Sequence, residues 1–313
     1  MSPPRNATTT SPAASRGQAH GLLVLVILLW GINWPVMKLG LQDLTPLWLV
    51  AIRLGFGAAV LFLVLAATGR LKRPTRRDWP MLFAVGVLQM ALFMPVVNTG
   101  LEAVAAGRSA ILAYTTPLWV VPGAIMFLGE RLTPLKLAGL VLGILGLALL
   151  FNPLALDWTS RAVLIGNGLL MLGALIWAVA VLWIRRHHWH LSTLQLAPWQ
   201  MLLATLLVLP FAIVIDGDTP PRWTASAIAV VLYNGPIATA FCYWAATSVT
   251  RALPAITSTL SFLGVPCVGL AVSMLWLGEP FSPWLFGGFG LILAGVVLVT
   301  LADRRASAAS PTG

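Results

Sequence analysis

The feature that most constrains this chain is a series of apolar segments, each about 20 residues long, separated by short polar loops. A segment of that length can cross the hydrocarbon core of a bilayer as an α-helix, which satisfies its own backbone hydrogen bonds. Only 9% of the residues are charged, against about 25% in a typical soluble domain, so an ordinary soluble fold is excluded. We predict an all-α polytopic membrane protein with ten transmembrane helices, at residues 20–39, 46–68, 79–101, 106–128, 134–151, 162–184, 194–215, 224–247, 254–277 and 283–302.

The formal net charge of +10 comes from Lys and Arg residues that gather in the short loops. This distribution is typical of topology signals and not of a nucleic-acid-binding face. With ten spans, fourteen of the 19 Lys and Arg residues lie on the side of the two termini, and four lie on the opposite side. Because basic loops stay in the cytoplasm, we expect both termini to be cytoplasmic. The expected location is the cytoplasmic (inner) membrane. We expect the lipid bilayer and a small-molecule substrate as partners, and no binding of nucleic acid.

The chain repeats itself after about 149 residues. The stretches FLGERLTPLKLAGLVLGILGLALL (127–150) and WLGEPFSPWLFGGFGLILAGVVLV (276–299) are identical at eight of 24 positions. Because each copy contains five spans, an odd number, the second copy must cross the membrane in the opposite direction. Inverted-topology repeats are typical of transporters with alternating access. The predicted organisation is a disordered N-terminal tail at 1–19, a first five-helix repeat at 20–151, a second at 162–302 and a C-terminal tail at 303–313.

Each copy contains the motif LGE-x-x-[ST]-P, at residues 128–134 and 277–283. Ser and Thr are favoured N-cap residues, and Pro suits the first position of a helix. A carboxylate close to a helix N-terminus is stabilised by the helix dipole. We therefore interpret the motif as a turn and cap for the span that follows it, with Glu130 and Glu279 near that helix start.

The doubled motif, together with the sequence WG-x-N at residues 30–33, resembles the EamA-type drug/metabolite transporter family. The resemblance covers residues 20 to about 302. It implies the ten-helix fold of that family and the export of small metabolites. Within the family, the tryptophan and tyrosine content is most similar to that of amino-acid exporters, including exporters of aromatic amino acids.

The fifth and tenth predicted spans carry small residues at four-residue spacing, which lets helix backbones approach closely. The pairs are Gly139 with Gly143 and Gly290 with Ala294. They predict helix packing, either between the two repeats or between subunits. The sequence leaves open whether the protein is a monomer or a homodimer.

Five other spans contain proline near the middle. Proline leaves the carbonyl four residues before it without a helical partner and kinks the helix. Such breaks are tolerated in a membrane where they face protein or a water-filled cavity. In the first span, the stretch WGINWPVMK (30–38) adds a glycine to the proline. We expect gating or kink positions at Gly31, Pro35, Pro95, Pro117, Pro236 and Pro266.

Polar and aromatic side chains occur at the same depths as these prolines. Broken helices near the midplane are where transporters bind substrates, and aromatic rings would bury a large apolar group there. Helix packing and interfacial anchoring are the alternative roles of the same residue types. The candidate substrate-binding residues are Asn33, Trp34, Gln89, Asn98, Tyr114, Trp177, Tyr233, Asn234, Tyr243, Ser258 and Ser261.

All nine Asp and Glu residues are expected in loops, in tails or at span edges, whereas proton-coupled transporters place an ionisable group inside the bundle. We interpret Arg53, about two turns into the second span, as a side chain that snorkels to the interface. The sequence thus predicts a facilitative carrier whose cavity has no fixed charge. It would export small neutral or zwitterionic metabolites, amino acids and aromatic amino acids among them. An exporter of drug-like amphipathic compounds, a proton-coupled antiporter and a channel remain alternatives.

The chain shows no sequence motif of an enzyme. A catalytic site needs a nucleophile with a base, or a metal cluster, and neither a serine nucleophile elbow nor a His–Glu helix motif is present. The two cysteines, Cys242 and Cys267, both lie in apolar segments, where small buried hydrophobes are expected. We therefore expect no catalytic residues, no metal site and no cofactor.

Overall fold

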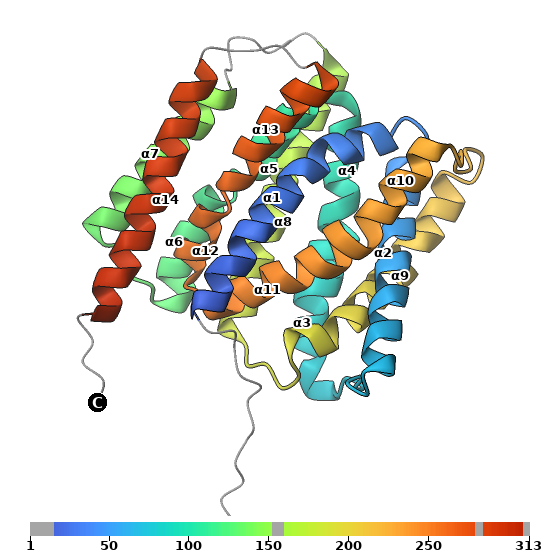
Figure 1. Cartoon of the computed structure of the whole chain (residues 1–313), viewed down its shortest axis with the longest axis horizontal. Helices are drawn as coiled ribbons and strands as arrows, with labels where there is room; N and C mark the ends of the chain where they lie inside the picture. The colour runs from blue at the N-terminus through green and yellow to red at the C-terminus, as the bar shows by residue number, and fades with distance from the viewer. Residues whose placement is uncertain (1–15, 152–159, 279–283, 309–313) are drawn as a thin grey trace, which may run out of the picture.

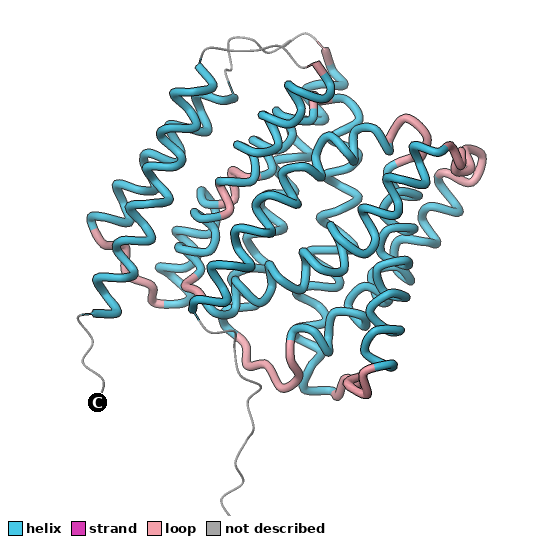
Figure 2. The backbone as a smooth tube through the Cα atoms, in the orientation of Figure 1, coloured by secondary structure: helices cyan, strands magenta, loops and turns pink. Residues whose placement is uncertain are grey.

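The computed structural model describes residues 16–151, 160–278 and 284–308. All regular structure in these ranges is helical (Figure 2). Eight helical segments are long and apolar enough to cross a membrane, and two shorter apolar helices accompany them, at Pro134–Leu149 and Gly290–Ala302. The eight spans coincide within a few residues with predicted ones: Gly17–Gly40, Pro46–Ala67, Arg76–Ala103, Ala106–Leu128, Arg161–Arg186, Thr193–Ile215, Ala225–Ala252 and Ala255–Leu277.

Four spans are single continuous helices, and Ser and Thr side chains begin three of them. Thr45, Ser160 and Ser192 each accept a hydrogen bond from a backbone N–H of the first turn, which satisfies a donor that the helix itself leaves unpaired. The continuous helices are α1 (Arg16–Gly40), α2 (Pro46–Ala67), α8 (Arg161–Arg186) and α9 (Thr193–Ile215). The two helices that contain the shorter apolar stretches are α7 (Pro134–Phe151) and α14 (Trp284–Ala308).

The other four spans are irregular in the middle. Two of them contain a π-helical stretch, which is a widened turn that often marks a functional site, and two are broken between a pair of short helices. The first π-containing span consists of η1 (Arg76–Asp78), α3 (Trp79–Met81), η2 (Leu82–Leu92) and α4 (Phe93–Ala103). The second consists of α10 (Ala225–Tyr233), η4 (Asn234–Phe241) and α11 (Cys242–Ala252). The broken spans are α5 (Ala106–Ala113) with α6 (Pro117–Leu128), and α12 (Ala255–Ser261) with α13 (Gly264–Leu277).

Four of the five mid-span prolines lie at or beside these irregular stretches. Pro236 lies within η4, and Pro95 is the third residue of α4, which begins where η2 ends. Pro117 is the first residue of α6, and Pro266 is the third residue of α13. Pro35 differs, because α1 continues as an α-helix past it to Gly40.

The two halves of the chain are interlocked (Figure 1). Helix α1 of the first half packs against α11 and α13 of the second, and α8 of the second half packs against α4 and α6 of the first. In the same way α2 packs on α9 and η4, while α9 packs on η2. Each contact between a helix of the first half and one of the second is therefore matched by a contact between the corresponding helices of the second and first halves. Two similar units related by a pseudo-twofold axis would produce this arrangement.

Glycines bring α7 and α14 into close contact at one edge of the molecule (Figure 1). Gly139 lies against the carbonyl of Gly295, and Gly146 against the carbonyl of Gly288. Gly139 and Gly146 occupy the same repeat positions as Gly288 and Gly295, so the two contacts are reciprocal. The packing thus joins the two halves of one chain. Gly290 takes no part in this packing between the halves, because nothing lies within 4 Å of a Cβ built there.

A basic side chain at the end of the first helix of each half caps the third span of that half. Lys38 Nζ donates to three carbonyl oxygens at the end of α4, at 2.7–3.0 Å. Arg185 Nη1 donates to the carbonyl of Arg251 at the end of α11, at 2.9 Å. Positive groups are favoured at helix C-termini, where carbonyls lack helical partners. The carbonyls that Lys38 contacts belong to Leu101, Glu102 and Val104.

The turn motif at residues 128–134 differs in part from the sequence prediction. Thr133 caps α7 as expected, since its hydroxyl accepts from the Lys136 N–H at 3.3 Å. The Glu130 carboxylate instead accepts from the N–H groups of Ala255 and Ile256, at 2.6 and 3.1 Å. It therefore caps the start of α12, in the other half of the chain. The second copy's Glu279, Ser282 and Pro283 lie outside the described residues.

The helices at the two ends of the chain are longer than predicted. Helix α1 begins at Arg16, where Ala19 is already fully buried, and α14 continues to Ala308. The apolar pattern marks the hydrocarbon-spanning part of a helix, whereas a helix continues into the polar interface without changing its backbone. The remainder of the predicted tails, 1–15 and 309–313, lies outside the described residues.

Candidate substrate site

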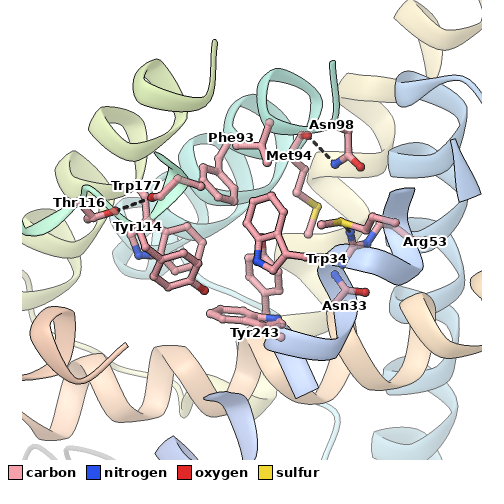
Figure 3. Close-up of a pocket in the computed structure, with 14 residues that line it drawn as sticks. Asn33, Trp34, Arg53, Phe93, Met94, Asn98, Tyr114, Thr116, Trp177 and Tyr243 are labelled. Atoms are coloured by element: carbon pink, nitrogen blue, oxygen red, sulfur yellow. Dashed lines mark hydrogen bonds between the residues drawn. The ribbon is translucent and has the colours of Figure 1, made fainter. Parts of the chain in front are cut away.

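A cavity lies at the centre of the bundle, where helices from both halves meet. Four of its residues, Trp30, Asn33, Trp34 and Met37, come from α1, and their three- and four-residue spacing places them on one helix face. Helix α4 contributes a second face, and α2, α8, α11 and the break between α5 and α6 complete the wall (Figure 3). The remaining lining residues are Arg53, Phe93, Met94, Val97, Asn98, Ala113, Tyr114, Thr116, Trp177 and Tyr243.

The cavity is small in this structure. The volume open to the centre of a water molecule is about 50 Å³, which is room for a few waters at about 10–15 Å³ each. A bound metabolite would require the lining side chains or helices to separate.

One end of the cavity is aromatic. Trp30 and Trp177, which are 147 residues apart and occupy corresponding places in the two halves, meet edge to face with 5.5 Å between ring centroids. Tyr243 packs on both, and Phe93 lies 4.9 Å from Trp177. Two polar atoms of these rings are tied to backbone carbonyls: Trp30 Nε1 to Ala238 at 2.9 Å, and the Tyr243 hydroxyl to Gln89 at 3.3 Å. These bonds hold the rings in place and leave their apolar faces toward the cavity.

The other end of the cavity contains a buried cation. Arg53 is only 2% exposed, and its guanidinium donates from Nε to Thr239 Oγ1 at 2.8 Å and from Nη1 to Met37 Sδ at 3.1 Å. The prediction that Arg53 snorkels to the interface is therefore wrong, as is the prediction of a cavity without fixed charge. Arg53 points inward because α9 and η4 pack closely on α2 and the hydroxyl of Thr239 offers a hydrogen bond there.

Two asparagines lie at the same end as Arg53 (Figure 3). Asn98 donates from Nδ2 to the Met94 carbonyl at 2.8 Å, which orients its amide. Asn33 Oδ1 and Asn98 Oδ1 are buried and have no hydrogen-bond partner among the described residues. Buried polar atoms are nearly always paired, so these two oxygens indicate a place for a donor.

Six of the eleven predicted binding residues line this cavity: Asn33, Trp34, Asn98, Tyr114, Trp177 and Tyr243. The other five are buried or half-buried elsewhere. Tyr233 donates to the Leu29 carbonyl, Asn234 to the Val230 carbonyl and Ser258 to the Ala255 carbonyl. The structure does not bring these five to the cavity lining, and the set is Gln89, Tyr233, Asn234, Ser258 and Ser261.

The expected gating positions lie around the cavity rather than in it. Gly31 is pressed against α13, where a Cβ would overlap the side chain of Val268. Its role in this structure is to let α1 and α13 approach. None of the six expected positions contributes to the lining, so their part in gating stays a prediction. They are Gly31, Pro35, Pro95, Pro117, Pro236 and Pro266.

Several lining residues were missed by the sequence reasoning. Trp30 and Met37 share a helix face with Asn33 and Trp34, so helical periodicity would have found them. Arg53 is a charged residue inside a span, and such a residue marks a functional site by default. Phe93, Met94, Val97, Ala113 and Thr116 carry no signal beyond their apolar or small character.

A larger crevice of about 430 Å³ lies between α5, α6, α7 and α8, but its character is different. Its lining is apolar apart from Thr115, Asn167 and the backbone. Metabolite sites combine an apolar wall with a few convergent polar groups, and the central cavity has that combination. Among the described residues, no group of three or more His, Cys, Asp or Glu side chains is placed to hold a metal ion.

Comparison with known proteins agrees with this architecture. The chain is 27% identical to the uncharacterized transporter YoaV of Bacillus subtilis, over 90% of this chain and 97% of that protein. It is 30% identical to a probable terminal-alkyne amino-acid exporter of Streptantibioticus cattleyicolor, over 90% and 94%. It is 28% identical to a probable amino-acid metabolite efflux pump of Escherichia coli, over 88% and 93%.

A protein of known crystal structure superposes with a TM-score of 0.70, over 93% of this chain and 99% of that one. Its sequence identity of 23% shows a shared fold only. The EamA-like transporter family profile matches the chain twice, at residues 18–152 and 164–301. These two matches cover both halves and nearly all the described helices. The chain therefore belongs to the EamA-like transporter family.

Proposed function

We propose that this protein is a carrier that exports small neutral or zwitterionic amino acids, including aromatic ones, across the cytoplasmic membrane. The observation that carries the proposal is the central cavity, where an aromatic end and a polar end face each other within one small space. An aromatic amino acid has the same division, with a ring at one end and charged groups at the other. Relatives named as a probable amino-acid exporter and efflux pump support this substrate class.

Alternating access is the transport mode that we propose for the ten helices, with the two halves inverted and both termini cytoplasmic. The reciprocal packing of α1 on α11 and α13, and of α8 on α4 and α6, supports two similar units around one site. Such units expose a midplane site to each side in turn by rocking against each other. The small volume of the cavity fits a carrier that must move to bind and release its substrate.

We further propose that transport is facilitative and follows the gradient of the substrate. A proton-coupled carrier needs a titrating group that the substrate or the access path reaches. The cavity lining, which consists of described residues only, includes no Asp or Glu. Glu102, an acid at the end of the third span, is exposed at the last turn of α4 and lies outside the lining.

A substrate panel in liposomes tests this proposal. Purified protein is reconstituted, and initial rates of uptake are measured against concentration for L-phenylalanine, L-tryptophan, L-alanine and a lipophilic quaternary cation. The proposal predicts saturable transport of the amino acids and none of the cation. Transport of the cation alone would establish a drug-type exporter. Amino-acid flux that rises linearly with concentration, without saturation, would establish a channel.

A further inference from the structure

We propose that Arg53 binds the carboxylate of the substrate and that the amide oxygens of Asn33 and Asn98 accept hydrogen bonds from its ammonium group. The site would then be specific for free α-amino acids, against amines and carboxamides of the same shape. This inference rests on the proposed function, because it assigns a polarity to the same cavity. The inference adds to the proposed function the residues that bind the charged end of the substrate.

The guanidinium of Arg53 is a buried cation that has no anionic partner among the described residues. It lies at the cavity, 2% exposed, and no Asp or Glu belongs to the lining. Leaving a charge buried and unpaired is strongly unfavourable in the low-dielectric interior of a protein. A substrate carboxylate that enters the cavity would supply the missing negative charge.

The two partners that Arg53 has orient the guanidinium without neutralising it. Thr239 Oγ1 and the sulfur of Met37 are uncharged acceptors, and a thioether is a weak one. Each takes one of the five N–H groups of the guanidinium. Nη2 has no hydrogen bond within the described residues, so its N–H groups remain for a carboxylate, and hydrogen bonds between two charged groups are the strong ones.

The unpaired amide oxygens supply the complementary half of the site. Asn98 is held by its Nδ2 bond to the Met94 carbonyl, so its oxygen is the atom left for a ligand. Asn33 Oδ1, on the facing helix α1, is also without a partner among the described residues. An ammonium group has three donors and no acceptor, so one placed between the two oxygens would satisfy both. A simple carboxylate without an ammonium group would leave them unpaired.

The polar end belongs to one half of the chain only. The N-caps of α2 and α9, Thr45 and Ser192, are 147 residues apart, like Trp30 and Trp177. At this offset the counterpart of Arg53 is Gln200, whose Nε2 donates to the Met81 carbonyl at 3.1 Å. Each half therefore contributes one tryptophan to the aromatic end, whereas only the first half contributes a cation. A zwitterion would bind in one orientation, with its charged groups toward α2.

Ligand competition measures the carboxylate preference directly. Purified protein is loaded with radiolabelled L-phenylalanine, which is displaced by unlabelled L-phenylalanine, by L-phenylalaninamide or by phenethylamine. Hydrogen bonds to a charged group are worth about 10–100-fold in affinity. The wild-type protein should therefore bind L-phenylalanine at least about 10-fold more tightly than the amide or the amine. In Arg53→Gln this ratio should fall below about 3-fold, and Arg53→Lys should restore part of it. Arg186→Gln, which removes a charge from an exposed position at the end of α8, should keep the wild-type ratio.

The possible results separate the inference from the proposed function. Equal affinity of the wild-type protein for acid and amide would overturn the inference, and this result needs no variant to fold. An unchanged ratio in Arg53→Gln would likewise overturn it and make Arg53 a packing residue. A wild-type protein that binds none of these ligands but transports the quaternary cation would overturn the proposed function, and the inference with it.

The amide oxygens have their own test. The wild-type protein should bind 3-phenylpropionate, which lacks the ammonium group, more weakly than L-phenylalanine. Asn98→Leu, which has a similar volume and no amide, should narrow that difference severalfold and leave the preference for acid over amide in place. An unchanged difference in Asn98→Leu would remove Asn98 from the proposed site.

Discussion

Replacing Gly295 by alanine tests whether the two halves are held together by direct backbone contact between α7 and α14. A Cβ at this position would lie 2.6 Å from the carbonyl oxygen of Gly139 and 3.2 Å from the N atom of Gly143. Both are backbone atoms, so no side-chain rotation relieves the overlap, and the helices must separate. Inserting a methyl group into a packed interface of this kind costs about 1–3 kcal/mol.

The matched control is Gly290→Ala, in the same helix, because nothing lies within 4 Å of a Cβ built there. Alanine is favoured over glycine in a helix by about 0.5–1 kcal/mol. This gain applies to both variants and cancels in their comparison. Gly295→Ala should therefore be less stable than Gly290→Ala by about 1–3 kcal/mol.

The difference is measured by thermal unfolding of the two purified variants in the same detergent. One kcal/mol corresponds to about 2–4 °C in domains of about 150–250 residues, so Gly295→Ala should unfold several degrees below Gly290→Ala. If Gly295→Ala unfolds at the same temperature as Gly290→Ala or above it, the reciprocal glycine contact does not hold the halves together.

Three further outcomes follow from the structure. Glu130→Gln removes the negative charge that caps α12, and it should destabilise the protein by about 0.5–2 kcal/mol; an unchanged unfolding temperature would contradict that cap. Lys38→Met removes three bonds to carbonyls at the end of α4, and a loss of about 1–3 kcal/mol is expected in denaturant unfolding. Glu102→Gln should leave amino-acid uptake unchanged with and without an imposed pH gradient, since Glu102 is exposed outside the cavity; gradient-driven uptake that this variant abolishes would refute facilitative transport.

The positions of the eight spans follow from the sequence because length and hydropathy are local properties of the chain. The sequence also indicates that Trp30 and Trp177, which are in contact, occupy corresponding positions of the two halves, because the internal repeat aligns them. The sequence does not indicate the partner of Glu130. Its carboxylate caps a helix start 125 residues away, and the sequence motif shows only the nearer helix.

The cavity could be predicted in part, because the position of a residue along a helix shows its depth but not the direction of its side chain. Tyr114 and Tyr233 both lie near a predicted break, yet only Tyr114 lines the cavity. Arg53 was misplaced for a related reason. Helix α2 is apolar around most of its circumference, so periodicity does not indicate which face is buried. The packing of α9 and η4 on α2 decides that the guanidinium lies inside.

Counterflow tests most directly whether the cavity between α1, α2, α4, α8 and α11 carries amino acids by alternating access. Liposomes preloaded with unlabelled L-phenylalanine are diluted into a trace of the labelled compound, with the wild-type protein, Trp34→Ala or Trp223→Ala. Trp34 lines the cavity, whereas Trp223 is exposed outside it. We predict transient accumulation of label with the wild-type protein and with Trp223→Ala, and a reduction of at least about 10-fold with Trp34→Ala, because losing a large aromatic contact costs more than about 1.4 kcal/mol. No accumulation above protein-free liposomes, or equal accumulation with both variants, would contradict the account.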